Sequence, residues 1–329
     1  MAPVEKPTFL AVSPDSRMLY AVSEVRNWRG EPGGAIGAWH ILPENAALEP
    51  INILGSGGDR PCHISLDSRG RVAVVAHYGD GSIAMFPVMA NGALGPCSNY
   101  LKNAGCSIDQ GRQRSAHAHG CFFSPDDSLL VEPDLGADRI YMYRTGVPKF
   151  ALIPESVPFA ATALGSGPRH FVFHPNLPVG YAVNELANTI TRYHCANEEV
   201  RLVPQETIST LDPQLSGASI AAEIAVDRAG RFLYCSNRGA DDIAVFAIDH
   251  EGKLTLIQRI DCGGRTPRHF ALDPTQKFVV LCNQDSDNVV VFARGSTTGK
   301  LQYTGIQIQV VSPTCVDFAS YQVLESSHP

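Results

Sequence analysis

Apolar and polar residues alternate over short stretches along this chain, and turns rich in Gly, Asp and Asn separate the stretches. Residues 221–249 show the pattern most clearly, with apolar side chains recurring at every second position over 224–226, 232–236 and 243–247 and a turn at 228–230. A period of two with β-branched and aromatic residues is typical of β-strands. These residues therefore predict three antiparallel strands joined by short turns.

The same unit recurs seven times. We take the turn after the first strand as its anchor, and the anchors fall at Pro14, Ser68, Pro125, Pro175, Arg228, Pro274 and, incompletely, Ser320. The spacings between them are 54, 57, 50, 53, 46 and 46 residues. Eighteen residues after the anchor, five copies carry an aromatic residue: Phe86, Tyr143, Tyr193, Phe246 and Phe292. A β-type repeat of about 50 residues is typical of a propeller.

Four antiparallel strands in each repeat would make one propeller blade, and residues 254–260 and 301–308 are candidates for the fourth strand. The sequence thus predicts an all-β, seven-bladed β-propeller that forms a single domain over residues 1–329. The last copy supplies one strand at 313–318, and only residues 1–6 precede the first copy. We therefore expect the last blade to lack two or three strands at its N-terminal side. A short helix or long loop is expected only at 204–219.

Composition narrows the function. The net charge is −7 and the sequence has no basic run, which argues against nucleic acid or an anionic membrane surface as partner. No apolar stretch approaches the ~20 residues of a membrane span, and no secretory signal is visible. The nine cysteines include no CxxC pair, which is typical of reduced thiols in a cytoplasmic protein. The oligomeric state is not predicted.

Two pairs of positions in each repeat carry polar residues that change from copy to copy. One pair opens the first strand, six and five residues before the anchor, and the other closes the second strand, nine and ten residues after it. Because these strands are antiparallel, both pairs lie at the same end of the blade, at one mouth of a closed ring. The polar residues at these positions include His63, His77, His119, Arg169, His170, Glu185, Glu223, Arg238, Arg268, His269 and Gln284.

Polar residues at the strand ends and turns also have purely structural interpretations. Asn184, Asn237 and Asn283 are expected to cap turns, and His174 is expected to bond to the backbone at its own turn. The polar mouth as a whole could serve as a protein-binding platform. Clustered ionisable groups shift each other's pKa and often mark function. His117 and His119 lie on one strand face without an assured third ligand, so no metal site is predicted.

The chain resembles the seven-bladed propeller lactonase family, which includes propeller-type 6-phosphogluconolactonases and carboxy-muconate cyclases. The resemblance covers essentially the whole chain and is most specific in GSGPRHFVFHPN at 165–176 and YAVNELANTITRY at 181–193. It implies a catalytic site made of His119, Arg169, Glu185 and Arg238, with Arg268 and Glu223 close by. The chain departs from the family at His77-Tyr78, where Asn-Tyr is usual, and lacks the family's extra strands before FLAVSPD.

The resulting prediction is hydrolysis of a sugar lactone, most specifically 6-phosphogluconolactone, without a cofactor. Arg169 would hold the developing negative charge or the phosphate, and His119 or Glu185 would take a proton from water. Because no GxSxG motif is present, an acyl-enzyme is not expected. The predicted substrate-binding residues are His63, His77, His170, Glu223, Arg268 and Gln284. The alternatives are cyclase-like lactone chemistry on a muconate and a propeller that binds a ligand without catalysis.

Overall fold

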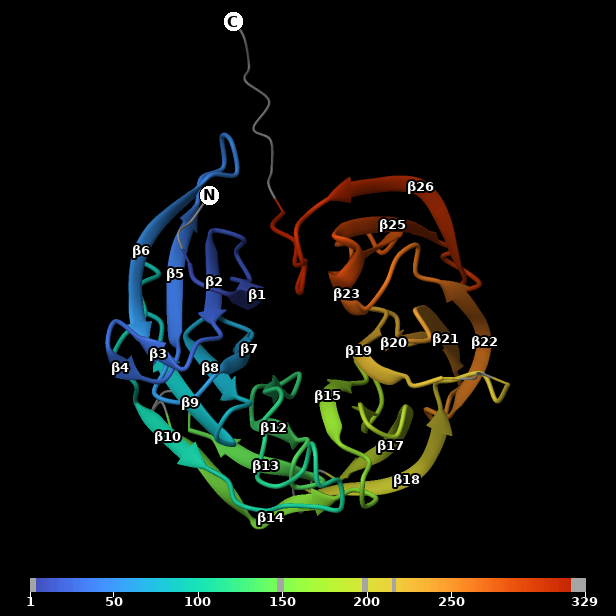
Figure 1. The fold of residues 1–329 in the computed structure, drawn as a ribbon, viewed down its shortest axis with the longest axis horizontal. Coiled ribbons are helices and arrows are strands. Elements are labelled where there is room, and N and C mark those ends of the chain that lie inside the picture. Colours follow the sequence, from blue (N-terminus) through green and yellow to red (C-terminus); the bar gives the residue numbers. More distant parts are fainter. Residues whose placement is uncertain (1–3, 147–150, 197–200, 215–216, 321–329) are drawn as a thin grey trace, which may run out of the picture.

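The computed structural model describes residues 4–146, 151–196, 201–214 and 217–320. These residues form six four-stranded antiparallel sheets, arranged around a common centre as the blades of a propeller (Figure 1). Blades one to three contain β1 (Pro7–Val12), β2 (Met18–Ser23), β5 (Ala35–Ile41) and β6 (Leu48–Gly55); β7 (Pro61–Leu66), β8 (Val72–His77), β9 (Ser82–Pro87) and β10 (Asn99–Lys102); and β11 (Phe122–Phe123), β12 (Leu129–Asp134), β13 (Arg139–Thr145) and β14 (Leu152–Ala161).

Blades four to six have the same order. Their strands are β15 (Pro168–Phe173), β16 (Val179–Asn184), β17 (Thr189–Ala196) and β18 (Arg201–Ser209); β19 (Ile220–Val226), β20 (Phe232–Arg238), β21 (Asp242–Ile248) and β22 (Leu254–Asp261); and β23 (Pro267–Leu272), β24 (Phe278–Asn283), β25 (Asn288–Arg294) and β26 (Leu301–Gln309). A short hairpin, β3 (Asn27–Trp28) with β4 (Glu31–Pro32), and a 3₁₀ turn, η1 (Gln284–Ser286), complete the described elements.

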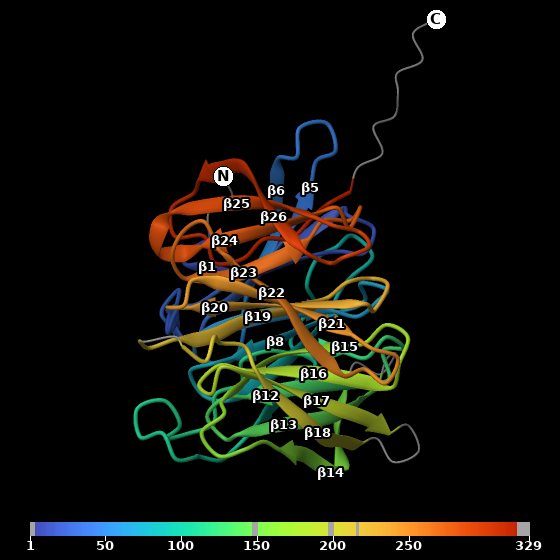
Figure 2. The ribbon, with the colours of Figure 1, turned by 90° about the vertical axis from the view of Figure 1, so that its right-hand side faces the viewer.

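The first strand of each blade lies innermost, and neighbouring inner strands contact each other, as β1 does β7 and β19 does β23. In the side view of Figure 2, blades six, five and four follow one another from top to bottom, with their loops on either side. Among the described residues, no helix has the length and apolar character needed to cross a membrane.

The predicted repeat is confirmed strand by strand. In blade five the strands over 224–226, 232–236 and 243–247 lie within β19, β20 and β21, and the expected fourth strands at 254–260 and 301–308 are β22 and β26. The expectation of a helix or loop at 204–219 is wrong for its first part, since Pro204–Ser209 belongs to β18. A bulge in β18 opposite β17 leaves Pro204 paired with Tyr193, so this proline is accommodated in an outer strand.

Within residues 4–320 as the structure describes them, the seventh blade is represented by a single extended segment. Residues 310–320 contain no strand and lie between blades one and six, where Figure 1 shows them entering the gap beside β1 and β23. The Val12 amide donates to Asp317 Oδ2 at 2.9 Å, and the Val316 amide donates to His269 Nδ1 at 3.3 Å. The prediction of an incomplete last blade is therefore confirmed, with the segment after Pro313 in its innermost position.

The core lies between the blades. Blades one and two bury Tyr20, Ile36 and Phe86 against one another, and blades five and six bury Tyr234 and Phe292 in the same way. Burial of aromatic and branched side chains contributes about 1.5–3 kcal/mol each. The sheets thus pack face to face through apolar side chains. The polar ends of the inner strands lie at the centre of the molecule.

Candidate active site

The two residues that close each second strand point in opposite directions, because successive side chains on a strand alternate. The first member of the pair turns away from the centre: Asn184 donates to Thr189 Oγ1 at 2.9 Å, and Asn237 donates to Asp242 Oδ1 at 2.7 Å. The second member, such as Glu185 or Arg238, faces inward. The asparagines have structural partners, but they do not cap their own turns through the backbone as expected: Asn184 also donates to Thr191 Oγ1, and Asn237 and Asn283 donate to the carbonyls of Thr210 and Cys262.

His77 is a first member, and the structure places it outside the site. Its ring is fully buried, and Nδ1 lies 3.2 Å from the Ser82 carbonyl and 3.1 Å from the Ser82 hydroxyl. A Cβ on Gly58 would touch the same ring at 2.4 Å, so the imidazole is packed inside the blade. The prediction that His77 binds substrate is therefore not supported: this histidine takes the structural place of the asparagine in other blades.

At the start of the inner strands a β-bulge changes the direction of the side chains. The register shifts between Pro168 and His170 in β15 and between Pro267 and His269 in β23. A bulge inserts one extra residue and re-aims its side chain. This allows Arg169 and His170, although adjacent in sequence, both to reach the centre. Proline precedes each of these bulges, and its missing N–H interrupts the ladder at that point.

Glu185 is the hub of one group of charges, which we call the Glu185 cluster: Glu185, Arg112, Arg169, Arg238 and His119. Arg112 Nη2 donates to Oε1 at 2.6 Å, and Arg238 Nη2 donates to Oε2 at 2.7 Å. Arg169 Nε lies 3.1 Å and His119 Nε2 3.8 Å from the same Oε2. The four predicted catalytic residues thus lie together, although that role itself stays a prediction.

Burial and charge set the protonation of this cluster. Burial raises the pKa of Glu185, but Arg238, His119, Arg169 and Arg112 outweigh it and hold that pKa far below the ordinary value of 4.5. Burial, with the charges of Arg238 and Arg268, lowers the pKa of Arg169 to about 10. Burial and the charge of Arg169 hold the pKa of His119 well below 6.5. Near pH 7 the cluster therefore contains an ionised Glu185 and a neutral His119.

Arg112 is the member of this cluster that sequence reasoning missed. It lies on the long connection between β10 and β11 and is 36% exposed, compared with 4% for Arg169 and 11% for Arg238. Its Nη2 also donates to the hydroxyl of Tyr78 at 3.3 Å. The repeat could not place Arg112, because it falls outside the fixed offsets. The only sequence signal is the repeat spacing of 57 residues, the longest in the chain.

A second group of ionisable side chains, which we call the Glu223 cluster, consists of Glu223, His170, His269 and His63. His170 Nδ1 and His269 Nε2 lie 3.0 Å and 3.3 Å from Glu223 Oε2. The His63 and His170 rings are 5.1 Å apart. Burial raises the pKa of Glu223 above its ordinary value, against the effect of His269 and Arg169. Within the described residues, no three histidine, cysteine or acidic side chains are arranged to hold a metal ion.

The predicted residues do not all share one mouth. Arg268 and Gln284 lie at the mouth formed by the strand starts, where Arg268 Nη1 donates to Gln284 Oε1 at 3.3 Å. His63 and His269 instead line a cavity of about 580 Å³ that reaches the opposite, turn side of the ring. For His63 and His269 the expectation of a single mouth is wrong. His63 lies on its strand beyond the bulge, one step further from the mouth than the bulged Cys62.

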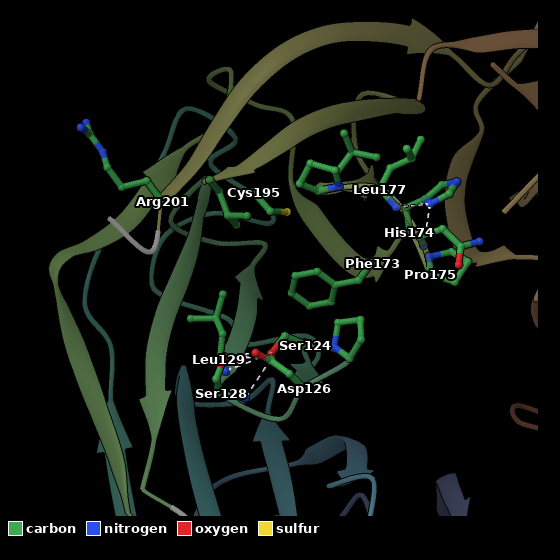
Figure 3. Close-up of a pocket in the computed structure, with 15 residues that line it drawn as sticks. Ser124, Asp126, Ser128, Leu129, Phe173, His174, Pro175, Leu177, Cys195 and Arg201 are labelled. Atoms are coloured by element: carbon green, nitrogen blue, oxygen red, sulfur yellow. Dashed lines mark hydrogen bonds between the residues drawn. The ribbon is translucent and has the colours of Figure 1, made fainter. Parts of the chain in front are cut away.

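A separate cavity of about 650 Å³ opens on the turn side between blades three and four (Figure 3). It contains none of the predicted site residues. Phe173 points into it, and His174 forms part of its wall. The Asn176 and Leu177 amides donate to His174 Nδ1 at 3.0 and 2.9 Å, and its Nε2 lies 2.8 Å from the Gly230 carbonyl. The structural interpretation of His174 is therefore confirmed.

The fold and the site together define a class of protein: a β-propeller whose centre holds a buried carboxylate surrounded by arginines. The chain belongs to the family described as "Lactonase, 7-bladed beta-propeller", whose family model matches residues 1–318. It is 31% identical to the 6-phosphogluconolactonase of Bacillus subtilis over 320 residues, covering 96% of this chain and 88% of that one. It is 32% identical to the 6-phosphogluconolactonase of Formosa agariphila over 318 residues, covering 95% and 88%.

Solved structures lead to the same family. A periplasmic gluconolactonase of Pseudomonas aeruginosa superposes with a TM-score of 0.89 and 32% identity, covering 97% of this chain and 90% of that one. A protein of Bacteroides fragilis described as a putative 6-phosphogluconolactonase superposes with a TM-score of 0.87 and 28% identity, covering 96% and 88%. The resemblance inferred from the sequence motifs is thus confirmed, and so is the propeller fold.

Proposed function

We propose that this protein is a lactonase that hydrolyses a sugar lactone, with 6-phosphogluconolactone as the first candidate. The observation that carries the proposal is the Glu185 cluster, in which one buried carboxylate aligns three guanidinium groups beside a neutral imidazole. The names of the relatives from Bacillus subtilis and Formosa agariphila support the same substrate.

The hydrolysis of a lactone requires stabilisation of the negative charge that develops on the carbonyl oxygen. A water oxygen bonds to the lactone carbonyl carbon, the ring C–O bond breaks, and the ring oxygen leaves as a hydroxyl after taking a proton. The product acid ionises and releases one proton near pH 7. Arg169 and Arg238 are placed to stabilise the negative charge that develops on the carbonyl oxygen, because Glu185 holds both in fixed positions.

His119 is the better of the two bases that the sequence offered. Both oxygens of Glu185 already accept hydrogen bonds from arginine, and its strongly lowered pKa makes it a weak base. His119 is neutral near pH 7 and its Nδ1 has no hydrogen-bond partner among the described residues. We therefore assign proton removal from water to His119 and the positioning of the arginines to Glu185.

The test is lactone opening followed by proton release, with spontaneous hydrolysis subtracted. We expect Arg169→Ala to lower the rate by about 10²–10³-fold, the usual cost of losing an oxyanion contact. Arg228→Ala is the matched control, because this exposed arginine lies on a turn at the opposite end of blade five. A folded wild-type protein with no rate above background would refute the lactonase and favour a ligand-binding propeller.

Preference for an unphosphorylated muconolactone would instead favour the cyclase-like alternative. We also propose that residues 1–329 act as a single domain, since strands of successive blades contact one another from blade one to blade six. A cytoplasmic location is proposed from the nine cysteines, all of them free. The described solved relative from Pseudomonas aeruginosa is a periplasmic protein, so fractionation of cells is the direct test.

A further inference from the structure

The arginines at the centre of the propeller differ in how their charge is balanced. Arg112, Arg169 and Arg238 share Glu185, and Arg294 pairs with Asp227 between blades five and six. Arg268 is half-buried in the same region, yet it has no carboxylate within 4.0 Å among the described residues. Its hydrogen-bond partner is the neutral amide oxygen of Gln284, at 3.3 Å. Arg268 thus carries an unbalanced positive charge.

Arg268 faces a cavity of about 610 Å³, which we call the mouth cavity. Its ionisable walls are Lys6, Arg60, Arg268 and one carboxylate, Glu24. Thr8, Ser312, Thr314 and Gln284 add hydroxyl and amide groups. Arg60 pairs with Asp59, with Nε 3.6 Å from Oδ2, so Glu24 and Asp59 together still leave one positive charge in excess. The polar walls of the cavity can also donate hydrogen bonds. This combination of charge and donors suits an anion.

The mouth cavity adjoins the Glu185 cluster through Tyr78. The guanidinium of Arg60 lies 5.5 Å from the centre of the Tyr78 ring, and the hydroxyl of that tyrosine accepts from Arg112 at 3.3 Å. Arg268 is also near enough for its charge to lower the pKa of Arg169, after burial and Arg238. A ligand anchored in the mouth cavity would therefore lie next to the proposed reaction centre.

We infer that the mouth cavity is the anion subsite of this protein and that Arg268 binds the phosphate monoester of a phosphorylated sugar lactone. A guanidinium has five N–H donors in a planar fork, and the bond to Gln284 uses one of them, so a pair remains for two phosphate oxygens. Glu185 shares one negative charge among three guanidinium groups, and the buried Arg169 and Arg238 are held against it. Arg268 has no carboxylate partner and faces the mouth cavity, so it is the arginine most open to a phosphate. The inference rests on the proposed lactonase function.

Because Arg268 is assigned to the phosphate and Arg169 to the carbonyl, their variants should differ in kinetics. Losing a charge-assisted hydrogen bond costs a factor of about 10–100, and here the loss should fall only on a phosphorylated substrate. We expect Arg268→Gln to raise KM for 6-phosphogluconolactone by about 10–100-fold while kcat/KM for unphosphorylated gluconolactone stays within twofold of wild type. Arg169→Ala should lower kcat/KM for both lactones, because it acts on the carbonyl that they share.

The experiment measures both lactones with wild type, Arg268→Gln, Arg268→Lys and the control Arg228→Ala. Arg268→Lys should recover part of the affinity, since it restores the charge but not the fork. Removing Arg268 leaves no described carboxylate without its partner, so the variants are expected to fold, as a thermal melt will check. Equal losses on both lactones in Arg268→Gln would overturn the inference, as would a wild type that does not prefer the phosphorylated lactone.

Titration calorimetry with inorganic phosphate tests the subsite without catalysis. Heat of binding in wild type that disappears in Arg268→Gln supports the subsite even if neither lactone is hydrolysed, in which case the proposed function alone fails. Unchanged phosphate binding in Arg268→Gln overturns it. A carboxylated muconolactone is the third substrate: a loss confined to that substrate would assign Arg268 to a carboxylate and overturn the phosphate assignment.

Discussion

Replacing Glu185 by glutamine tests whether this carboxylate organises the centre of the propeller. Glu185→Gln keeps the size of the side chain but removes the one negative charge that Arg112, Arg169 and Arg238 share. The Arg169 and Arg238 side chains are only 4% and 11% exposed, so water cannot replace the lost partner. Removing one partner of a buried pair costs about 3–5 kcal/mol. We expect the free energy of unfolding at pH 7 to fall by that amount.

The pH dependence gives an independent check on the same variant. The pKa of Glu185 is lowered in the folded protein, so its stabilising contribution is complete above the ordinary value of 4.5. As the pH falls below that value, the unfolded chain takes up a proton that the folded protein does not, and the contribution is lost. The difference between wild type and Glu185→Gln should therefore be constant from pH 8 to about pH 5 and shrink in more acidic solution.

Urea unfolding measures this difference, with circular dichroism as the probe and kcat/KM for the lactone measured in parallel. Glu251→Gln is the control, because Glu251 pairs with Lys253 on the surface, where the loss of an ion pair should leave the unfolding midpoint unchanged. The reasoning is refuted if Glu185→Gln unfolds within 1 kcal/mol of wild type at pH 7. A stability difference that grows as the pH falls below 4.5 would refute it equally.

Three further predictions follow from buried groups. Arg294→Met should lower the free energy of unfolding by about 3–5 kcal/mol, measured in urea, because it leaves Asp227 buried without its partner. Stability should fall below pH 6.5 by up to about 1.4 kcal/mol per pH unit for each of His63, His119 and His170, since burial lowers their pKa and only the unfolded chain then binds the protons. An unfolding midpoint that is constant from pH 7 to 5 would contradict this. Arg112→Ala should reduce kcat/KM about tenfold while leaving the melting temperature nearly unchanged, because its side chain is 36% exposed.

The sequence was sufficient to predict the blades because each one repeats the same local chemistry. Turn residues at the anchors and apolar residues at every second position fix both the strands and their pairing, as β19, β20 and β21 illustrate. The incomplete seventh blade could be predicted for the same reason, since the last copy of the repeat supplies only one strand. Residues 204–209 were misjudged because a proline in an outer strand resembles a loop.

The site could be predicted only where the repeat positions it. The offsets brought Glu185, Arg169 and Arg238 together, since Arg169 and Glu185 lie at strand ends of blade four and Arg238 lies at the matching strand end of blade five. The alternation of side chains would have excluded His77, which occupies the outward position of its pair. Arg112 could not be found in this way, because it lies on a connection outside the repeat, where no fixed offset predicts the position of a side chain. Its position depends on the tertiary contacts with Tyr78 and Glu185.

The balance of charge explains how one small centre could bind an anion and also stabilise another that forms during the reaction. If every arginine were unbalanced, a phosphate would bind equally well at the reaction centre and would block it. Glu185 opposes this by sharing its one negative charge among the three arginines around it, which offsets part of their positive charge and keeps their N–H groups fixed in direction. Arg268 keeps its full charge at the mouth, where Gln284 orients it without cancelling it. A Glu185→Gln protein should for this reason bind inorganic phosphate more tightly than wild type and be inhibited by it, and weaker phosphate binding in that variant would show that the two groups of arginines are not separated by charge.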